Sequence, residues 1–131
     1  MRILSFDGST LYELEGRTLG VLSSNRMPMV EIVISNDVRI ERASSYTVAR
    51  FNSEEEAKAF LKKVVAILDY DYECIIVMAD MNKFVVKSGR LYSELYFQEN
   101  ELGFYTVKGS SPIKGIDELQ RVDSLPRDVL I

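Results

Sequence analysis

One segment, residues 54–68, constrains the fold most, because it alone carries the apolar periodicity of a long helix. Ser53 stands three residues before Glu56, the spacing of a capping box that satisfies backbone amides at a helix start. Glu54 and Lys58 are four residues apart and can form a weak ion pair. Such a helix needs an apolar surface to cover. Its apolar stripe consists of Ala57, Phe60, Leu61, Val64, Ile67 and Leu68.

The first 51 residues have the pattern of short strands joined by tight turns. An Asp-Gly or Asn-Asp pair between two apolar runs indicates a hairpin, because these residues tolerate a positive φ. The predicted turns are Asp7-Gly8, Glu15-Gly16 and Asn36-Asp37. The predicted strands run over residues 3–6, 10–12, 18–22, 30–35, 38–43 and 46–51.

Strand patterns return after the helix, and their spacing predicts a four-stranded antiparallel meander. These strands are expected at residues 74–79, 83–87, 90–98 and 102–108. Alternation is clearest in the third of them, where successive side chains must point to opposite faces. One face carries Leu91, Ser93, Leu95 and Phe97, and the other carries Tyr92, Glu94, Tyr96 and Gln98.

Together these patterns predict an α+β fold: a mainly antiparallel sheet of N-terminal hairpins and a C-terminal meander, with the helix at about 54–68 packed on it. The length of 131 residues suits one domain, which we expect to span residues 1–122. A short helix is expected at 116–122 and a C-terminal tail at 123–131. The order of the strands does not follow from the sequence.

The chain contains no histidine, the side chain most used for acid–base catalysis near neutral pH and the commonest transition-metal ligand. The single cysteine, Cys74, has acidic neighbours and no adjacent base that would activate it, so a buried structural thiol is expected. A lone cysteine also suits a reduced, cytoplasmic protein. No Gly-rich phosphate loop and no nucleophile elbow occurs, and no cofactor is expected.

The charge balance disfavours two classes of partner. Twenty acidic residues outweigh sixteen basic ones, which leaves a net charge of −4. Nucleic acids and anionic membranes are bound through basic patches, so neither is an expected partner. The apolar runs are far shorter than the roughly 20 residues of a transmembrane helix, and the N-terminal segment lacks the pattern of a secretory signal.

One acidic cluster is a candidate metal site. Asp69, Asp71 and Glu73 are two residues apart, so in an extended segment their carboxylates would share one side, as Mg²⁺ or Ca²⁺ would require. Asp80 is a fourth candidate ligand. A calcium loop, however, would need glycine where Cys74 stands. The competing interpretation, which we favour, is a solvated acidic connection between the helix and the next strand.

Tyr92, Glu94 and Tyr96 form the candidate interface, and Tyr105 on the next strand is expected to join them. Tyrosine is enriched at protein interfaces because it buries a large area and keeps a polar tip. The competing interpretation is that a second layer from the N-terminal half covers these rings. We predict a small, non-catalytic binding or regulatory protein that acts through protein–protein contact, as a homodimer. The alternative is a carboxylate-based, divalent-metal-dependent hydrolase or nuclease.

Overall fold

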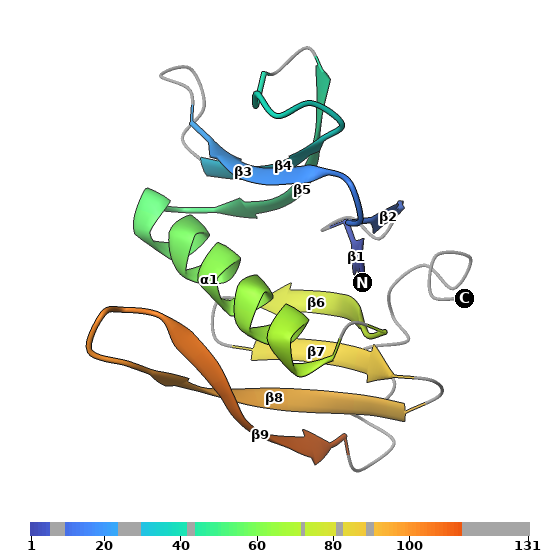
Figure 1. Ribbon diagram of the computed structural model, residues 1–131, viewed down its shortest axis with the longest axis vertical. Coiled ribbons are helices and arrows are strands. Elements are labelled where there is room, and N and C mark those ends of the chain that lie inside the picture. Colours follow the sequence, from blue (N-terminus) through green and yellow to red (C-terminus); the bar gives the residue numbers. More distant parts are fainter. Residues whose placement is uncertain are drawn as a thin grey trace.

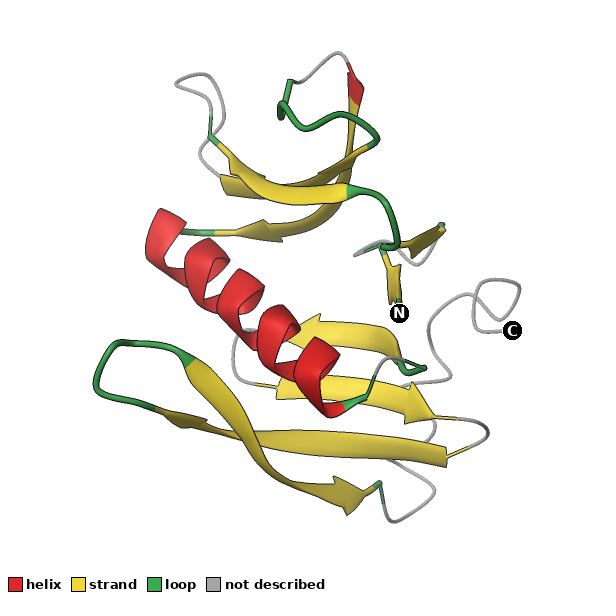
Figure 2. Cartoon of the chain, viewed as in Figure 1, coloured by secondary structure: helices red, strands yellow, loops and turns green. Residues whose placement is uncertain are grey.

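A computed structural model describes residues 1–5, 10–23, 30–41, 44–71, 73–80, 83–88 and 91–113 (Figure 1). Within these ranges the chain forms nine strands and one helix, so the α+β prediction is confirmed (Figure 2). The predicted short helix at 116–122 and the tail at 123–131 lie outside the described residues. The elements are β1 (Arg2–Leu4), β2 (Leu11–Glu13), β3 (Thr18–Leu22), β4 (Val30–Ser35), β5 (Ser45–Phe51), α1 (Glu54–Tyr70), β6 (Ile75–Asp80), β7 (Lys83–Ser88), β8 (Leu91–Glu99) and β9 (Tyr105–Pro112).

The strands form two sheets. The large sheet has six strands in the order β2-β1-β6-β7-β8-β9, and the small sheet has three in the order β3-β4-β5. The predicted C-terminal meander, β6 to β9, is antiparallel throughout. In Figure 1, α1 runs diagonally between the small sheet above it and the meander below it. The helix therefore packs against two sheets, where the sequence led us to expect one.

The helix begins as the sequence predicts. The Ser53 hydroxyl accepts a hydrogen bond from the Glu56 amide at 3.2 Å, and the Glu56 carboxylate accepts from the Asn52 amide, also at 3.2 Å. The Lys58 ammonium lies 3.3 Å from the Glu54 carboxylate. The helix ends at Tyr70, two residues later than predicted. Within the described ranges, no helix has both the length and the apolar composition needed to cross a membrane.

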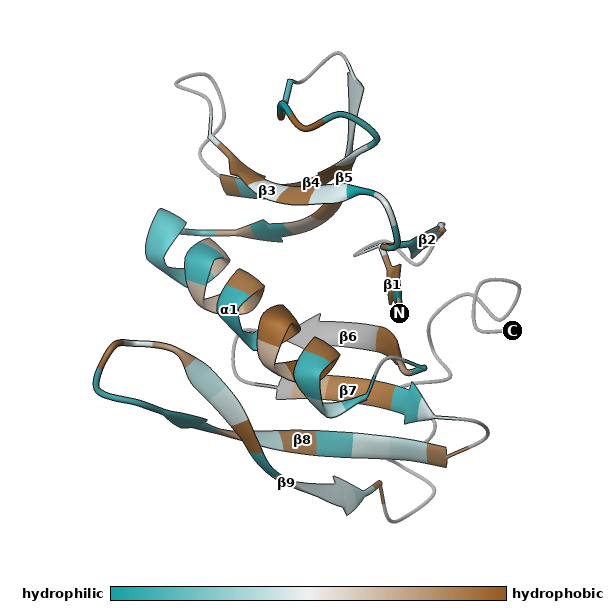
Figure 3. Cartoon of the chain, viewed as in Figure 1, coloured by the Kyte–Doolittle hydropathy of each residue, from teal (hydrophilic) through white to brown (hydrophobic). Residues whose placement is uncertain are grey.

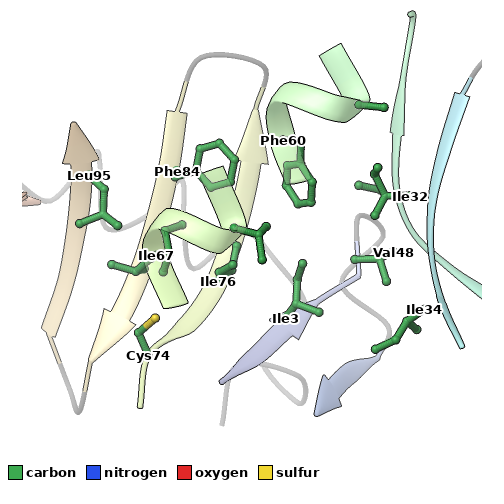
Figure 4. Close-up of a cluster of buried hydrophobic side chains, with 14 of the residues drawn as sticks. Ile3, Ile32, Ile34, Val48, Phe60, Ile67, Cys74, Ile76, Phe84 and Leu95 are labelled. Atoms are coloured by element: carbon green, nitrogen blue, oxygen red, sulfur yellow. The ribbon is translucent and has the colours of Figure 1, made fainter. Parts of the chain in front are cut away.

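One continuous core joins the helix to both sheets (Figure 4). The stripe residues Ala57, Phe60, Val64 and Ile67 are buried as predicted, and apolar and polar residues alternate along the helix in Figure 3. Side chains of both sheets converge on this stripe, so the helix and the two sheets share their main core. The buried partners include Ile32 and Ile34 of β4, Val48 of β5, Ile3 of β1, Ile76 of β6, Phe84 of β7 and Leu95 of β8.

A chain of five aromatic rings crosses this core from one sheet to the other. Phe51 of β5 lies 5.2 Å from Phe60 of α1, and Phe60 lies 5.3 Å from Phe84 of β7. Phe84 lies 5.4 Å from Phe97 of β8, which lies 6.3 Å from Tyr105 of β9. These centroid separations fall in the range in which aromatic pairs attract beyond simple area burial. The rings thus link the small sheet to the last strand of the large one.

The N-terminal strand β1 belongs to the large sheet, not to the small one that follows it. It pairs with β2 in the predicted hairpin, whose turn lies outside the described residues, and it pairs in parallel with β6. Ile3 lies opposite Ile76, and the Arg2 amide donates to the Cys74 carbonyl at 3.3 Å. This pairing makes the large sheet mixed and inserts the N-terminus into the common core.

The predicted strand at 38–43 is wrong over residues 38–41, the part of it that the structure describes, and so is the two-residue turn before it. A primed hairpin turn requires a positive φ at both central residues, and no described residue other than glycine has one. Instead, the Asp37 amide donates to the Ser35 hydroxyl at 3.1 Å, and a longer bend begins there. Val38 is 93% exposed, while Ile40 packs over Gly20 of β3. Val38 and Ile40 therefore have different environments, and residues 38–41 pair with no neighbouring strand among those described.

The contact between Gly20 and Ile40 predicts a selective effect of adding one methyl group. A Cβ atom at Gly20 would lie 2.8 Å from Cγ1 of Ile40, so Gly20→Ala should lower the free energy of unfolding by about 1–3 kcal/mol. Gly109→Ala in β9 is the matched control, because a Cβ atom there meets nothing within 4 Å. It should leave stability unchanged or raise it by up to about 1 kcal/mol. Urea unfolding followed by circular dichroism tests both, and equal stability of the two variants would contradict the placement of Ile40.

Candidate functional site

The predicted alternation along β8 is correct and defines an outer face of the large sheet, the face turned away from α1. Residues directly opposite in an antiparallel pair share a face. Leu95 is buried in the core on the helix side. Tyr92 and Glu94 lie opposite Lys87 and Val85 of β7, and Tyr96 lies opposite Gly109 of β9. Tyr92, Glu94 and Tyr96 therefore share the outer face.

Tyr92 is already engaged within the fold. Its ring packs against a second small apolar cluster built on Leu4 and Val85, and the Lys87 ammonium lies 5.5 Å from the ring centroid. The Tyr92 carbonyl also accepts a hydrogen bond from the Ile113 amide at 3.0 Å. Tyr92 is half-buried by these neighbours, so it stabilises the outer face more than it offers free surface.

Tyr96 differs, because 49% of it remains exposed. Gly109 stands directly across from it on β9 and contributes no side chain. The space above Gly109 is open, since a Cβ atom built there would meet no atom within 4 Å. The ring of Tyr96 therefore borders free surface, where a partner can cover it.

Tyr105 does not join the other two tyrosines. It pairs with Glu99, and its ring lies 6.3 Å from Phe97 at an angle of 80°, on the side of the sheet that faces α1. The β8–β9 register shifts between Tyr96 and Phe97, and this irregularity has no local sequence signal. The structure thus brings together Tyr92, Glu94 and Tyr96 and places Tyr105 in a different environment.

That environment is a cationic–aromatic cluster that the sequence analysis missed. The Lys63 ammonium lies 5.5 Å from the ring centroids of Phe84 and Phe97 and 5.2 Å from that of Tyr105. Burial lowers the pKa of Lys63, and the nearby Glu99 carboxylate partly offsets this. One signal was available in the sequence: Lys63 directly precedes Val64 of the apolar stripe, where a lysine can bury its stem and keep its amine at the edge.

The β8–β9 hairpin also carries an exposed apolar tip. Asn100 orders the connection, because its side-chain oxygen accepts from the amides of Leu102 at 2.9 Å and Phe104 at 3.0 Å. Leu102 is 80% exposed and Phe104 is also exposed. With Leu91 and Tyr96, this hairpin holds half of the exposed large apolar side chains of the described residues. β9 is also the outermost strand, with no neighbour beyond it among the described strands.

The acidic cluster does not form a metal centre in the part of the chain that the structure describes. Asp71 is the C-cap residue that follows the helix, and its carboxylate accepts a hydrogen bond from the Glu73 amide at 2.9 Å, a local turn contact. Asp69 is exposed in the last helical turn. The Asp80 side chain is not among those that the structure describes. No three aspartate, glutamate, histidine or cysteine side chains among the described residues are grouped so as to hold an ion.

Cys74 is a buried free thiol, as predicted. Its Sγ donates to the Asp71 carbonyl at 3.1 Å. Burial, together with the negative charge of Asp71, raises the pKa of the thiol to about 11. A thiol in this state has almost no nucleophilic thiolate near neutral pH, so Cys74 belongs to the core.

The buried Glu31 of β4 is a second titratable group that the sequence analysis did not single out. Its carboxylate accepts from the Thr47 hydroxyl at 2.9 Å and lies 3.7 Å from Nε of Arg50. Both partners lie on the neighbouring strand β5, on the same face of the small sheet. A buried carboxylate paired in this way ties two strands together and has a structural role.

Comparison of the chain with protein-family models, curated proteins and solved structures gives no match.

The environment of Cys74 predicts slow thiol chemistry in the folded protein. At pH 8, Ellman's reagent should react at least about a hundredfold more slowly with the native protein than with the urea-unfolded chain. The folded state keeps the thiol proton to a higher pH than the unfolded state does. The contribution of Cys74 to stability is therefore complete below the ordinary thiol pKa and is lost as the pH rises toward 11. Cys74→Ala is the control for both measurements, and equal reaction rates in the two states would contradict the burial of the thiol.

The Lys63 cluster predicts that the stem of this side chain matters more than its charge. Lys63→Met keeps an unbranched chain against the three rings and removes a partly desolvated ammonium, so the free energy of unfolding should change by less than about 1 kcal/mol. Lys63→Ala removes the stem and should cost about 1–2 kcal/mol. Urea denaturation distinguishes them. If the methionine variant lost as much stability as the alanine variant, the attraction between ammonium and rings would be the larger effect.

Proposed function

We propose that this protein is a small, non-catalytic binding protein that acts through protein–protein contact, and that its contact surface is the β8–β9 hairpin. The observation that carries the proposal is the gathering of exposed apolar side chains, among them Tyr96, Leu102 and Phe104, on the hairpin that also forms the edge of the large sheet. Exposed large apolar side chains that share one hairpin are candidates for contact with a partner.

The partner that we propose is a second copy of the chain. β9 runs for eight residues at the edge of an antiparallel meander, and Lys108 is its single charged residue. Natural proteins usually protect a long edge strand with several charges, a bulge or a covering segment. β9 has a bulge at Lys108 and ends at Pro112, so its edge is protected only in part. Antiparallel pairing of β9 with β9 of another copy would extend the sheet across a two-fold axis, the commonest symmetry of soluble dimers.

The side chains around the edge would supply the remaining contact area. A stable interface buries on the order of 1,200–2,000 Å², more than backbone pairing along one short strand provides. Tyr96 lies beside the edge on the outer face, and Leu102 and Phe104 lie at the hairpin tip. A dimer built on this hairpin would cover these apolar groups together with the strand edge.

A cytoplasmic location is part of the same proposal. The buried free thiol of Cys74 suits a reducing compartment. The alternative, a metal-dependent hydrolase or nuclease, has no grouped ligands among the described side chains to favour it.

Sedimentation velocity over a concentration series tests the dimer. Tyr96→Ser should weaken self-association about tenfold or more, because it truncates a central aromatic contact, and it should leave the circular dichroism spectrum unchanged. Tyr46→Ser on β5 is the matched control, since Tyr46 is also exposed but lies in the small sheet. A wild-type chain that stays monomeric at the highest attainable concentration would refute the homodimer, as would equal effects of the two substitutions.

A further inference from the structure

A hollow lies between α1 and the segment that joins β2 to β3, away from the β8–β9 hairpin. Its volume is about 280 Å³. Leu61, Val65 and Leu68 line it from the helix, and Leu14 and Leu19 line it from the opposite wall. Val65 is 56% exposed, so this apolar surface is open to ligands. Arg17 is the only charged side chain that lines it among the described residues.

A tight turn builds the wall that carries the charge. Gly16 has a φ of +72°, a conformation that favours glycine, and the Arg17 amide donates to the Leu14 carbonyl at 3.1 Å. This turn holds Leu14 and Arg17 close together at the rim of the hollow. No described acidic side chain forms an ion pair with the Arg17 guanidinium.

A second hollow, of about 370 Å³, adjoins the first and shares Leu14 and Leu68 with it. Its lining includes two carboxylates, Glu15 and Glu73, and also Met1, whose N-terminal ammonium lies 3.5 Å from a carboxylate oxygen of Glu13. The two hollows thus adjoin in one groove. The first part holds the Arg17 guanidinium, with which no described acidic side chain pairs, and the second part holds groups of both charges. An anionic head group is attracted to Arg17 in the first part, where no carboxylate stands among the described lining residues.

We propose that this groove binds an aliphatic carboxylate. The hydrocarbon chain lies on Leu14, Leu61 and Leu68, and the carboxylate accepts hydrogen bonds from the guanidinium of Arg17. The first hollow, of about 280 Å³, is slightly smaller than the usual range for ligand pockets, which favours a short chain over a drug-sized molecule. This inference is independent of the dimer, because no residue of the β8–β9 hairpin lines the groove.

Octanoate titration followed by methyl ¹H–¹³C NMR tests the inference, with octanol and acetate as probes that lack the charge or the chain. Octanoate should shift the methyl signals of Leu14, Leu19 and Val65, and acetate should not. Octanol should bind more weakly than octanoate, because it cannot pair with Arg17. Absence of shifts at these methyl groups, or shifts confined to the β8–β9 hairpin, would overturn the site.

Three variants separate the two parts of the interaction. Arg17→Gln should weaken octanoate about threefold or more and leave octanol unchanged, whereas Arg39→Gln, an exposed arginine that does not line the groove, should affect neither ligand. Val65→Asp should abolish binding of both by placing a carboxylate on the apolar wall, and its exposed position keeps the fold intact. Equal octanoate affinity of the Arg17→Gln variant and the wild type would overturn the role of Arg17.

Discussion

The rest of the structure depends on the burial of one face of α1 between two sheets. Phe60, Val64 and Ile67 are almost fully buried there, and each contributes roughly 1.5–3 kcal/mol by leaving water. Without the helix, the small sheet would expose Ile32 and Ile34, and the large sheet would expose Phe84. The two sheets share no strand. They are held together by the helix, by the aromatic rings that cross it and by the direct stacking of Tyr12 of β2 on Tyr46 of β5.

The two candidate binding surfaces, the β8–β9 hairpin and the groove beside α1, both lie at the border of this shared core. The helix covers the inner face of the large sheet, while Tyr96 on the outer face stays half-exposed. On its other flank, α1 leaves Val65 exposed, and the turn at Gly16 forms the facing wall of the groove. The molecule thus has exposed apolar side chains near the sheet edge at β9 and, beside α1, a groove with apolar walls and the Arg17 guanidinium. Among the described residues, neither surface has an activated nucleophile or a group of side chains that could hold a metal ion.

Features set by neighbouring residues were predictable, and features set by distant ones were not. The helix start at Ser53, the alternation that separates Leu95 from Tyr96 and the burial of Cys74 all follow from local patterns. The alternation of Val38 and Ile40 led to the wrong prediction of a strand, because Ile40 is apolar for another reason: it covers Gly20 of β3. Tyr105 faces α1 because it pairs with Glu99 across the hairpin, and Lys63 has its aromatic neighbours on strands β7 to β9. Register and strand order are set by contacts between segments far apart in the sequence.

The parallel pairing of β1 with β6 has a kinetic consequence. During synthesis β1 emerges first, but its partner strand emerges only after the small sheet and α1 have been made. The small sheet and the helix can assemble from contacts of short sequence separation, whereas closing the large sheet requires a long loop to be ordered first. Until then Ile3 and its neighbours remain uncovered on the nascent chain. Insertion of the N-terminal strand is therefore expected to be a late event in folding, one that a chain cut short before residue 75 cannot complete.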